Sequence, residues 1–450
     1  MSRITKLAAL TTALLGLTVF QAQAKVSETE AAKLGTSLTP VGADPKANAN
    51  GSIPAYTGGL GQKGNPAKID TTDIYASEKP LYTITKANMA QYKDKLSVGH
   101  QKMLERYPTY KMNVYPSHRD ASFPQAIYDA TKKNAVSAEL VGGDPDGLKG
   151  ASLGFPFPIP QTAAEVIWNH RLKWRGEAVL RNNDQVIVQP NGTQLLTRLV
   201  EEVLFPYASI KSPGKFDTPD AVSIYYLSET VAPPRNAGQF ILAWEHPNER
   251  SAWIYNPALR RIRRAPTVAY DNPYEGTDGN QFYDQVDMYN GKLDRFTWKL
   301  IGKKEMIITN SSAKINNFSL KYKDMLKTGH INQDLARYEL HRVWVIEANN
   351  KPETRHTFKK KVLYVDEDTW NVVMTDNYDQ RDQYYKFHEG HLVTVREIQA
   401  STTVPEILYD LQSGGYFATA LVNEGKPNDL TVTYTKDRFT PEGIKKRTSR

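Results

Sequence analysis

Alternation of apolar and polar residues dominates the chain from about residue 177 onward. Runs such as 185–188 (QVIV), 240–244 (FILAW) and 252–255 (AWIY) are rich in β-branched and aromatic residues, which favours strands. Asn191-Gly192 separates two such runs, and this dipeptide is a strong signal for a tight hairpin turn. The second part of the chain is therefore predicted to be a series of strands.

Further turns continue this pattern toward residue 435. Asn290-Gly291 predicts another tight hairpin leading into the run 296–301, and residues 366–368 (DED) predict a turn between 362–365 and 370–374. Successive strands with short polar connections indicate a large antiparallel meander.

The first part of the chain has a different texture. Prolines and glycines in residues 25–80 exclude long helices and central strands, which predicts an extended arm. Helical spacing then appears in three segments, 86–105, 124–134 and 162–172. Thr85 is expected to cap the first helix, Pro124 to begin the second and Asn134 to end it. Thr162 and Glu165 have the spacing of a capping box at the start of the third.

These patterns predict a mainly β, α+β fold, in which a large curved antiparallel sheet or half-barrel is covered by a few α-helices. An apolar sheet face needs a cover, and the three helices are the obvious one. The predicted segments are a signal peptide (1–24), an extended arm (25–80), a helical cover (81–176), an antiparallel half-barrel (177–435) and a basic C-terminal tail (436–450).

The first 24 residues have the pattern of a secretory signal peptide. Arg3 and Lys6 precede an apolar run over 7–20, and Ala22-Gln23-Ala24 is a small-x-small cleavage site. The chain contains no cysteine, which excludes disulfides, thiolate metal sites, cysteine nucleophiles and acylation of a lipoprotein cysteine. We expect export to the periplasm as a soluble, unlipidated protein.

The net charge is mildly positive, with 57 basic and 49 acidic residues giving +8. Part of the excess lies at the C-terminus, in Lys445, Lys446, Arg447 and Arg450. In an exported protein this charge attracts anionic lipid head groups or acidic glycans. A frayed, solubilising tail explains the same residues more simply. Nucleic acid is not an expected partner in this compartment.

Five aromatic residues on predicted strands are candidates for lining an apolar pocket. They are Trp244, Trp253, Tyr255, Trp298 and Trp344. Aromatic side chains offer large rigid surfaces to an apolar ligand, but each of them also suits an ordinary packed core.

Arg261 and Arg263 belong to the densest charge cluster in the chain, residues 260–264 (RRIRR). On a strand these two side chains share one face, where planar guanidinium groups bind a carboxylate or phosphate head group in bidentate fashion. The alternative is a solvated edge strand whose charges prevent aggregation.

Sequence patterns for metal binding or catalysis are absent. His341 and His356 have Glu339 and Glu347 nearby in the sequence, but not in the spacing of a metal site. The acidic run at 366–368 lacks the glycine and distal glutamate of a calcium loop. There is no Gly-x-Ser-x-Gly elbow, His-Glu-x-x-His motif or phosphate loop. We therefore expect no metal, no cofactor and no enzymatic activity.

Several motifs together resemble a bacterial family, the domain-of-unknown-function family 1329. They are 38–43 (LTPVGA), 53–55 (IPA), 154–158 (GFPFP), 168–169 (WN), 253–257 (WIYNP), 260–266 (RRIRRAP), 290–291 (NG), 298–300 (WKL), 302–305 (GKKE), 337–345 (RYELHRVWV) and 366–370 (DEDTW). Tyr56 stands where the family pattern has tryptophan, and residues 307–311 (IITNS) diverge from it.

The resemblance implies a fold like that of the lipoprotein carriers LolA and LolB, a half-barrel whose mouth is closed by helices and which holds an acyl chain or another apolar molecule. It also implies an outer-membrane companion protein and an exporter of the resistance-nodulation-division kind as partners. The leading hypothesis is a non-enzymatic periplasmic carrier or chaperone for a hydrophobic or lipid-like ligand. The alternatives are a periplasmic protein that binds or modifies glycans, suggested by the abundant Tyr and Trp, and an adaptor between envelope proteins with no ligand of its own.

Overall fold

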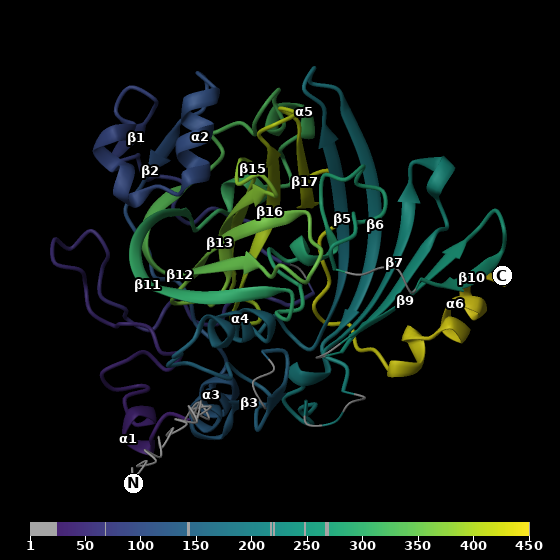
Figure 1. Ribbon diagram of the computed structural model, residues 1–450, viewed down its shortest axis with the longest axis horizontal. Helices are drawn as coiled ribbons and strands as arrows, with labels where there is room; N and C mark the ends of the chain where they lie inside the picture. The colour runs from purple at the N-terminus through teal and green to yellow at the C-terminus, as the bar shows by residue number, and fades with distance from the viewer. Residues whose placement is uncertain are drawn as a thin grey trace, which may run out of the picture.

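The computed structural model describes residues 25–449 except 68, 142–144, 217, 219–220, 247–248 and 266–269. The predicted signal peptide, residues 1–24, lies outside the described residues. One curved sheet forms the body of the molecule (Figure 1). Its strand order is β1-β2-β12-β13-β14-β15-β16-β17-β5-β6-β7-β8-β9-β10, and β11 also pairs with β12.

Two antiparallel meanders make up most of the sheet, and the short strands β1 and β2 extend it beyond β12. The first comprises β5 (Ala178–Val188), β6 (Gln194–Leu204), β7 (Ile224–Ala232), β8 (Phe240–Glu245), β9 (Arg250–Asn256) and β10 (Arg261–Arg264). The second comprises β11 (Phe296–Thr309), β12 (Tyr338–Asn350), β13 (Phe358–Asp366), β14 (Val372–Asp379), β15 (Tyr384–Val395), β16 (Ala400–Asp410) and β17 (Tyr416–Leu421). The predicted fold class, a large curved antiparallel sheet with few helices, is confirmed.

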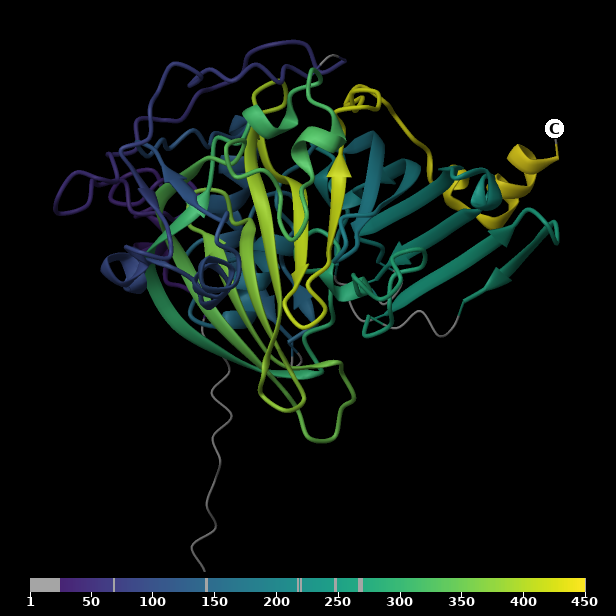
Figure 2. The same cartoon turned by 90° about the horizontal axis from the view of Figure 1, so that it is seen from above.

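Pairing of β17 with β5 joins the two meanders. Tyr416 lies opposite Val188 and Phe417 opposite Ile187, but the register shifts between Ala418 and Leu421. Figure 2 shows the resulting shape from above, with β7 to β10 extending away from the more tightly curved second meander.

Two predicted turns have different outcomes. The hairpin at Asn191-Gly192 is confirmed, since β5 and β6 pair on either side of it and Gly192 has φ of 87°. The prediction of a hairpin at Asn290-Gly291 is wrong, because these residues lie in the long connection between β10 and β11. There the backbone N–H of Asn290 donates to the carbonyl of Asp284 (2.8 Å), which fixes a loop that folds back on itself.

The helix predicted over 86–105 is two helices. A 3₁₀-helix, η1 (Met89–Lys95), is followed by α2 (Val98–Arg106), and Leu96 between them is extended. Ser97, not Thr85, caps the α-helix: its hydroxyl accepts the N–H of His100 (3.1 Å). A competing cap inside an apolar periodic pattern therefore divided the predicted helix.

The other two helices agree better with their patterns. In α4 (Ala163–Arg171) the predicted capping box is present, with Thr162 and Glu165 hydrogen-bonded to each other's backbone N–H (3.3 and 3.2 Å). Helix α3 (Gln125–Ser137) starts directly after Pro124 but continues past Asn134. The side-chain amide of Asn134 is buried and donates to the carbonyl of Leu153 (2.9 Å). Asn134 therefore binds a neighbouring loop from within the helix and does not end it.

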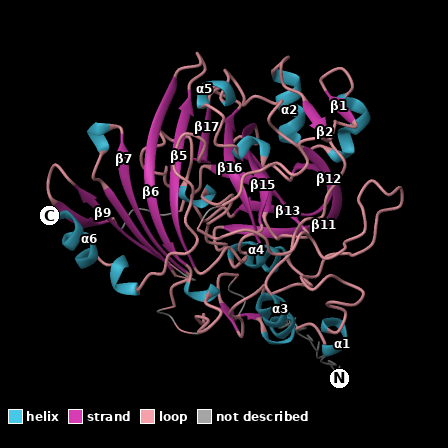
Figure 3. Ribbon diagram, turned by 180° about the vertical axis from the view of Figure 1, so that it is seen from behind, coloured by secondary structure: helices cyan, strands magenta, loops and turns pink. Residues whose placement is uncertain are grey.

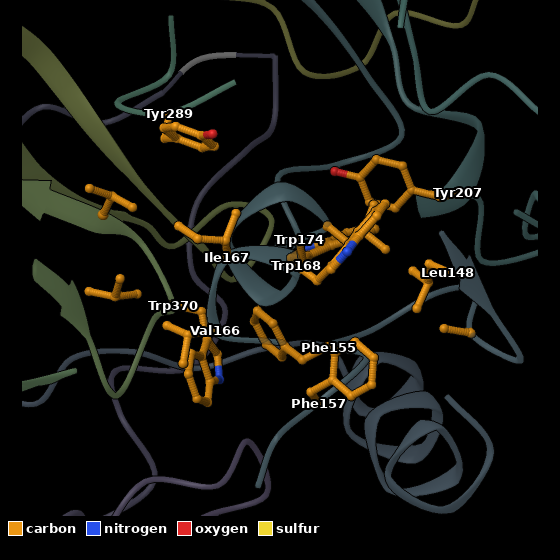
Figure 4. Close-up of a cluster of buried hydrophobic side chains, with 14 of the residues drawn as sticks. Leu148, Phe155, Phe157, Val166, Ile167, Trp168, Trp174, Tyr207, Tyr289 and Trp370 are labelled. Carbon is orange, nitrogen blue, oxygen red and sulfur yellow. The ribbon is translucent and has the colours of Figure 1, made fainter. Parts of the chain in front are cut away.

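Both faces of the second meander are buried in packed clusters. On β12, Trp344, Ile346 and Ala348 pack on the side of α4, while Val343 and Val345 belong to a second cluster that includes Met103 and Leu104 of α2. Figure 4 shows the α4 side, where Trp168 and Val166 lie among Phe155, Trp370 and other rings. Helices α2 and α4 thus cover the sheet as predicted, whereas α3 packs against α1 and the loop at Leu153, and large side chains fill the space beneath the helices.

The remaining elements are short. They are α1 (Glu28–Ala31), β1 (Tyr82–Ile84), β2 (Met112–Val114), β3 (Glu139–Leu140), β4 (Leu148–Lys149), α5 (Tyr322–Met325) and α6 (Pro441–Thr448). Figure 3 shows α2 with β1 and β2 at one end of the molecule and α1 with α3 at the other. No helix in the described part of the chain is both long and apolar enough to cross a membrane.

The C-terminal residues do not fray, contrary to expectation. Phe439 and Ile444 are completely buried against Tyr225, Leu227 and Leu242 of β7 and β8, which fixes α6 on the sheet. The guanidinium groups of Arg438 and Arg447 both bind the carboxylate of Glu202.

Candidate functional site

An apolar cavity of about 270 Å³ lies between the N-terminal arm and the second meander. Residues 60–64 and 69–75 of the arm form one wall. Strands β15 and β16 form another, and Phe318 lies beside them. Its apolar lining residues are Leu60, Ile69, Ile74, Tyr75, Phe318, Val393, Val395, Val404 and Val422.

A small number of hydrogen bonds hold the arm over this cavity. The N–H of Lys63 donates to the carbonyl of Arg396 (3.1 Å), and the Arg396 guanidinium donates to the carbonyl of Leu60 (2.9 Å). The carboxylate of Glu397 accepts the N–H of Asp70 (2.6 Å). Lining residues on the arm, such as Ile74, are half exposed. A segment held by a few hydrogen bonds and little buried apolar surface opens at a lower free energy than a packed core does.

Polar groups gather at one side of the cavity. The Asp120 carboxylate accepts hydrogen bonds from the hydroxyls of Tyr75 (2.7 Å) and Ser311 (3.1 Å). Burial raises the pKa of Asp120 above its ordinary value, against the effect of these two hydrogen bonds. The cavity therefore combines an apolar interior with a polar rim, which suits a molecule with an apolar body and a polar end.

A buried charge network lies next to this rim. On β12, Glu339 binds the guanidinium of Arg337 (2.6 Å) and Nε2 of His341 (3.1 Å), and Asn310 donates to it (2.9 Å). Burial disfavours the charged imidazole, but the Asp366 carboxylate, 3.6 Å from Nδ1, and the hydrogen bond to Glu339 raise the pKa of His341 to about 10. Burial likewise opposes ionisation of Glu339, yet His341 and Arg337 lower its pKa to about 2. Both groups are charged at neutral pH.

A second cavity, of about 90 Å³, is charged. It lies between β5 to β9, β16, β17 and the connection from β10 to β11. Arg181 pairs with Glu201 (2.8 Å), Arg250 pairs with Glu245 (2.9 Å), and Arg175 pairs with Asp287. None of these residues was predicted as a site residue. The sequence does contain one indication of this site: Glu201 lies in the middle of a strand pattern, at a position where a buried residue is expected to be apolar.

The five predicted pocket aromatics fall into two separate groups. Trp244, Trp253 and Tyr255 lie beneath the C-terminal segment, where the indole N–H of Trp244 donates to the carbonyl of Phe439 (2.7 Å). Tyr255 also lines an open groove beside α6. None of the three lines the apolar or the charged cavity.

The other two aromatics lie on the α4 side of the second meander. Trp298 packs on Tyr289 with ring centroids 5.5 Å apart, and its indole N–H donates to the carbonyl of Leu293 (2.8 Å). Trp344 stacks on Trp370 at 6.2 Å. The structure does not bring the five rings around one space.

Arg261 and Arg263 are exposed on β10, which ends the strand order. They lie away from the lining of both cavities. Leu259, in the turn between β9 and β10, is 54% exposed beside them. The cluster is thus an edge-strand surface, as the alternative interpretation had it, and whether it binds head groups remains a prediction.

The two histidines considered for metal binding contact different acidic residues. His341 lies between Glu339 and Asp366, whereas His356 contacts Asp284 (3.1 Å). Within the described ranges, no three His, Cys, Asp or Glu side chains are arranged to hold a metal ion. Asp368, in the predicted turn, instead forms a bidentate pair with Arg119 (2.8 and 2.6 Å).

The chain belongs to the family described as protein of unknown function DUF1329, whose model matches residues 83–445. It is 44% identical over 443 residues to the uncharacterized protein PA3922 of Pseudomonas aeruginosa, covering 96% of each chain.

Similar solved structures include a DUF1329 family protein from Desulfovibrio piger, with 14% identity and a TM-score of 0.41, covering 60% of this chain and 92% of that one. A LolA superfamily protein from Nitrosomonas europaea has 13% identity and a TM-score of 0.38, covering 63% of this chain and all of that one (100%). Both scores are below 0.5, so the function has to be inferred from the geometry of this chain.

The charge network predicts a specific pH dependence for the variant His341→Gln. The folded-state pKa of about 10 exceeds the ordinary 6.5, so the stabilisation by the imidazolium is complete below pH 6.5 and is lost as the pH rises toward 10. We expect the variant to lose about 3 kcal/mol of unfolding free energy at pH 6 and less at pH 9.5. Urea unfolding at both pH values measures this, and a loss independent of pH would contradict the assigned charge.

Proposed function

We propose that this protein is a non-enzymatic periplasmic carrier for a hydrophobic or lipid-like molecule with a polar end. The observation that carries the proposal is the apolar cavity beneath the arm, with Asp120, Tyr75 and Ser311 at its rim. The chemistry of the lining favours an amphiphile, because each methylene group buried there contributes about 0.8 kcal/mol. The signal-peptide pattern of residues 1–24 supports a periplasmic location.

The arm supplies the route for entry and release. The described residues between 60 and 75 contain no strand, and their contacts to Arg396 and Glu397 are hydrogen bonds that water can replace. A ligand can therefore enter when the arm lifts, without disturbance of the sheet. An outer-membrane companion protein and a resistance-nodulation-division exporter are proposed as the partners that would deliver or receive it.

We further propose that the β9–β10 turn docks on an anionic membrane surface. Leu259 projects beside Arg260, Arg261, Arg263 and Arg264, and none of these four guanidinium groups has an acidic partner within the described residues. Basic residues around an apolar one suit binding to lipid head groups, and each contributes about 1 kcal/mol near an anionic surface. In this proposal Arg261 and Arg263 contact head groups of the bilayer.

Filling the cavity tests the carrier function. In Val393→Trp the larger ring occupies the space beneath the arm, so uptake of a fluorescent fatty-acid probe should weaken at least tenfold. Val231→Trp, at an exposed position of β7, is the matched control and should bind as the unaltered protein does. Native mass spectrometry of protein purified from periplasm without detergent should find a bound amphiphile. Equal probe binding by both variants would refute the assignment of this cavity.

Charge reversal tests the docking surface. The double variant Arg261→Glu/Arg263→Glu should bind vesicles containing phosphatidylglycerol at least thirtyfold more weakly, because at least about 2 kcal/mol is lost. Lys132→Glu/Lys133→Glu on α3 changes the net charge equally and should keep most of the binding. Cosedimentation with vesicles at low and high salt provides the measurement. An equal loss in both variants would show that only net charge matters.

A further inference from the structure

The charged cavity is lined by ion pairs whose charges nearly cancel. Its three arginines, Arg175, Arg181 and Arg250, each pair with a carboxylate across the cavity wall. A fourth carboxylate, Glu406, is held by Nε2 of His388 (3.1 Å) and the N–H of Met288 (3.2 Å). An anion entering this space would meet four carboxylates and a cation three guanidinium groups. The lining therefore disfavours a charged ligand of either sign.

Hydrogen-bonding capacity remains unused inside the cavity. The Arg250 side chain is only 7% exposed, and its Nη1 has no hydrogen-bond partner among the described residues. Nε of Arg175 is likewise unpartnered. Buried polar atoms nearly always have partners, so donors left open on a cavity wall point to a missing acceptor.

The wall also supplies aromatic surface and acceptors. The Tyr226 hydroxyl donates to Glu201 (2.8 Å) and contacts the hydroxyl of Tyr274 (3.1 Å), while Phe205 lines the same space. With about 90 Å³ of free space the cavity has room for about three water molecules. A ligand can therefore insert a small polar edge into it, not a whole ring.

The backbone around the cavity adopts costly conformations. Asp287 (φ 54°) and Met288 (φ 64°) are consecutive left-handed residues, and Ala420 (φ 58°), in the β17 irregularity, also lines the cavity. Side-chain contacts hold them: Asp287 binds Lys173 (2.7 Å), and the N–H of Ala420 donates to Asn183 (2.8 Å). Strain of this kind clusters at ligand-binding sites.

We propose that this cavity receives the hydroxyl-bearing edge of a neutral sugar ring, from a free saccharide or from the sugar head group of a glycolipid. Vicinal hydroxyls both donate and accept, so they match alternating guanidinium and carboxylate groups, and the apolar face of a sugar ring packs on aromatic side chains. The inference is independent of the carrier function, because different residues line the two cavities.

Saturation-transfer NMR and calorimetry on the full-length mature protein test the proposal. The probes are glucose, galactose, mannose and N-acetylglucosamine, with octyl glucoside as the glycolipid arm and sodium phosphate and betaine as charged controls. We expect at least one neutral sugar to bind, and the charged controls not to bind. Binding of octyl glucoside with none by free sugars would assign the glycolipid source, provided that Arg250→Met weakens this binding and Val393→Trp does not.

Two variants locate the site. Arg250→Met removes the open donor, and Arg181→Met alters a more exposed wall residue in case the first variant fails to fold; each should weaken sugar binding at least tenfold. Arg235→Met, on the exposed β7–β8 connection, is the matched control, and Val393→Trp should leave sugar binding unchanged. Absence of binding by the free sugars and by octyl glucoside, or binding indifferent to both cavity variants, would overturn the proposal.

Discussion

The pairing of β17 with β5 is the constraint on which the rest of the structure depends. The two strands are more than 200 residues apart in the chain, and their backbone hydrogen bonds make one sheet from two meanders. The charged cavity exists only because of this pairing, since Asn183 and Gln185 come from one strand and Thr419 and Ala420 from the other. The register shift after Ala418 brings Thr419 and Ala420 to Asn183. Bulges often redirect residues in this way beside binding sites.

Burial of many charges is the second consequence of the large sheet. Glu339, His341 and Asp284 are almost fully enclosed, and each has an oppositely charged partner within hydrogen-bond distance. Such pairs contribute little net stability relative to apolar residues, but loss of one partner leaves a buried charge and is costly. They therefore fix a unique arrangement of loops and strands around the cavities more than they strengthen the fold.

The sequence predicted what local rules determine and missed what distant segments create. The Thr162 capping box, the Asn191-Gly192 hairpin and the alternating strands depend on residues close in the chain, and all are found. Asn290-Gly291 failed because its conformation is set by Asp284 and the rest of a long loop, not by the dipeptide. The aromatic residues were correctly placed on strands, but a period of two does not reveal which face lies against a helix and which against a cavity.

Both cavities were beyond prediction because their walls come from segments remote in sequence. Ile74 and Val393 meet across more than 300 residues, and neither looks unusual within its own segment. The two sites nevertheless share strands: Val404 lines the apolar cavity and Glu406 the charged one, at most about 7 Å apart along β16. Movement of this common wall would disturb both cavities at once, whereas the arm lines the apolar cavity alone. In the proposed carrier function, opening of the arm would therefore release an amphiphile while the charged cavity keeps its shape.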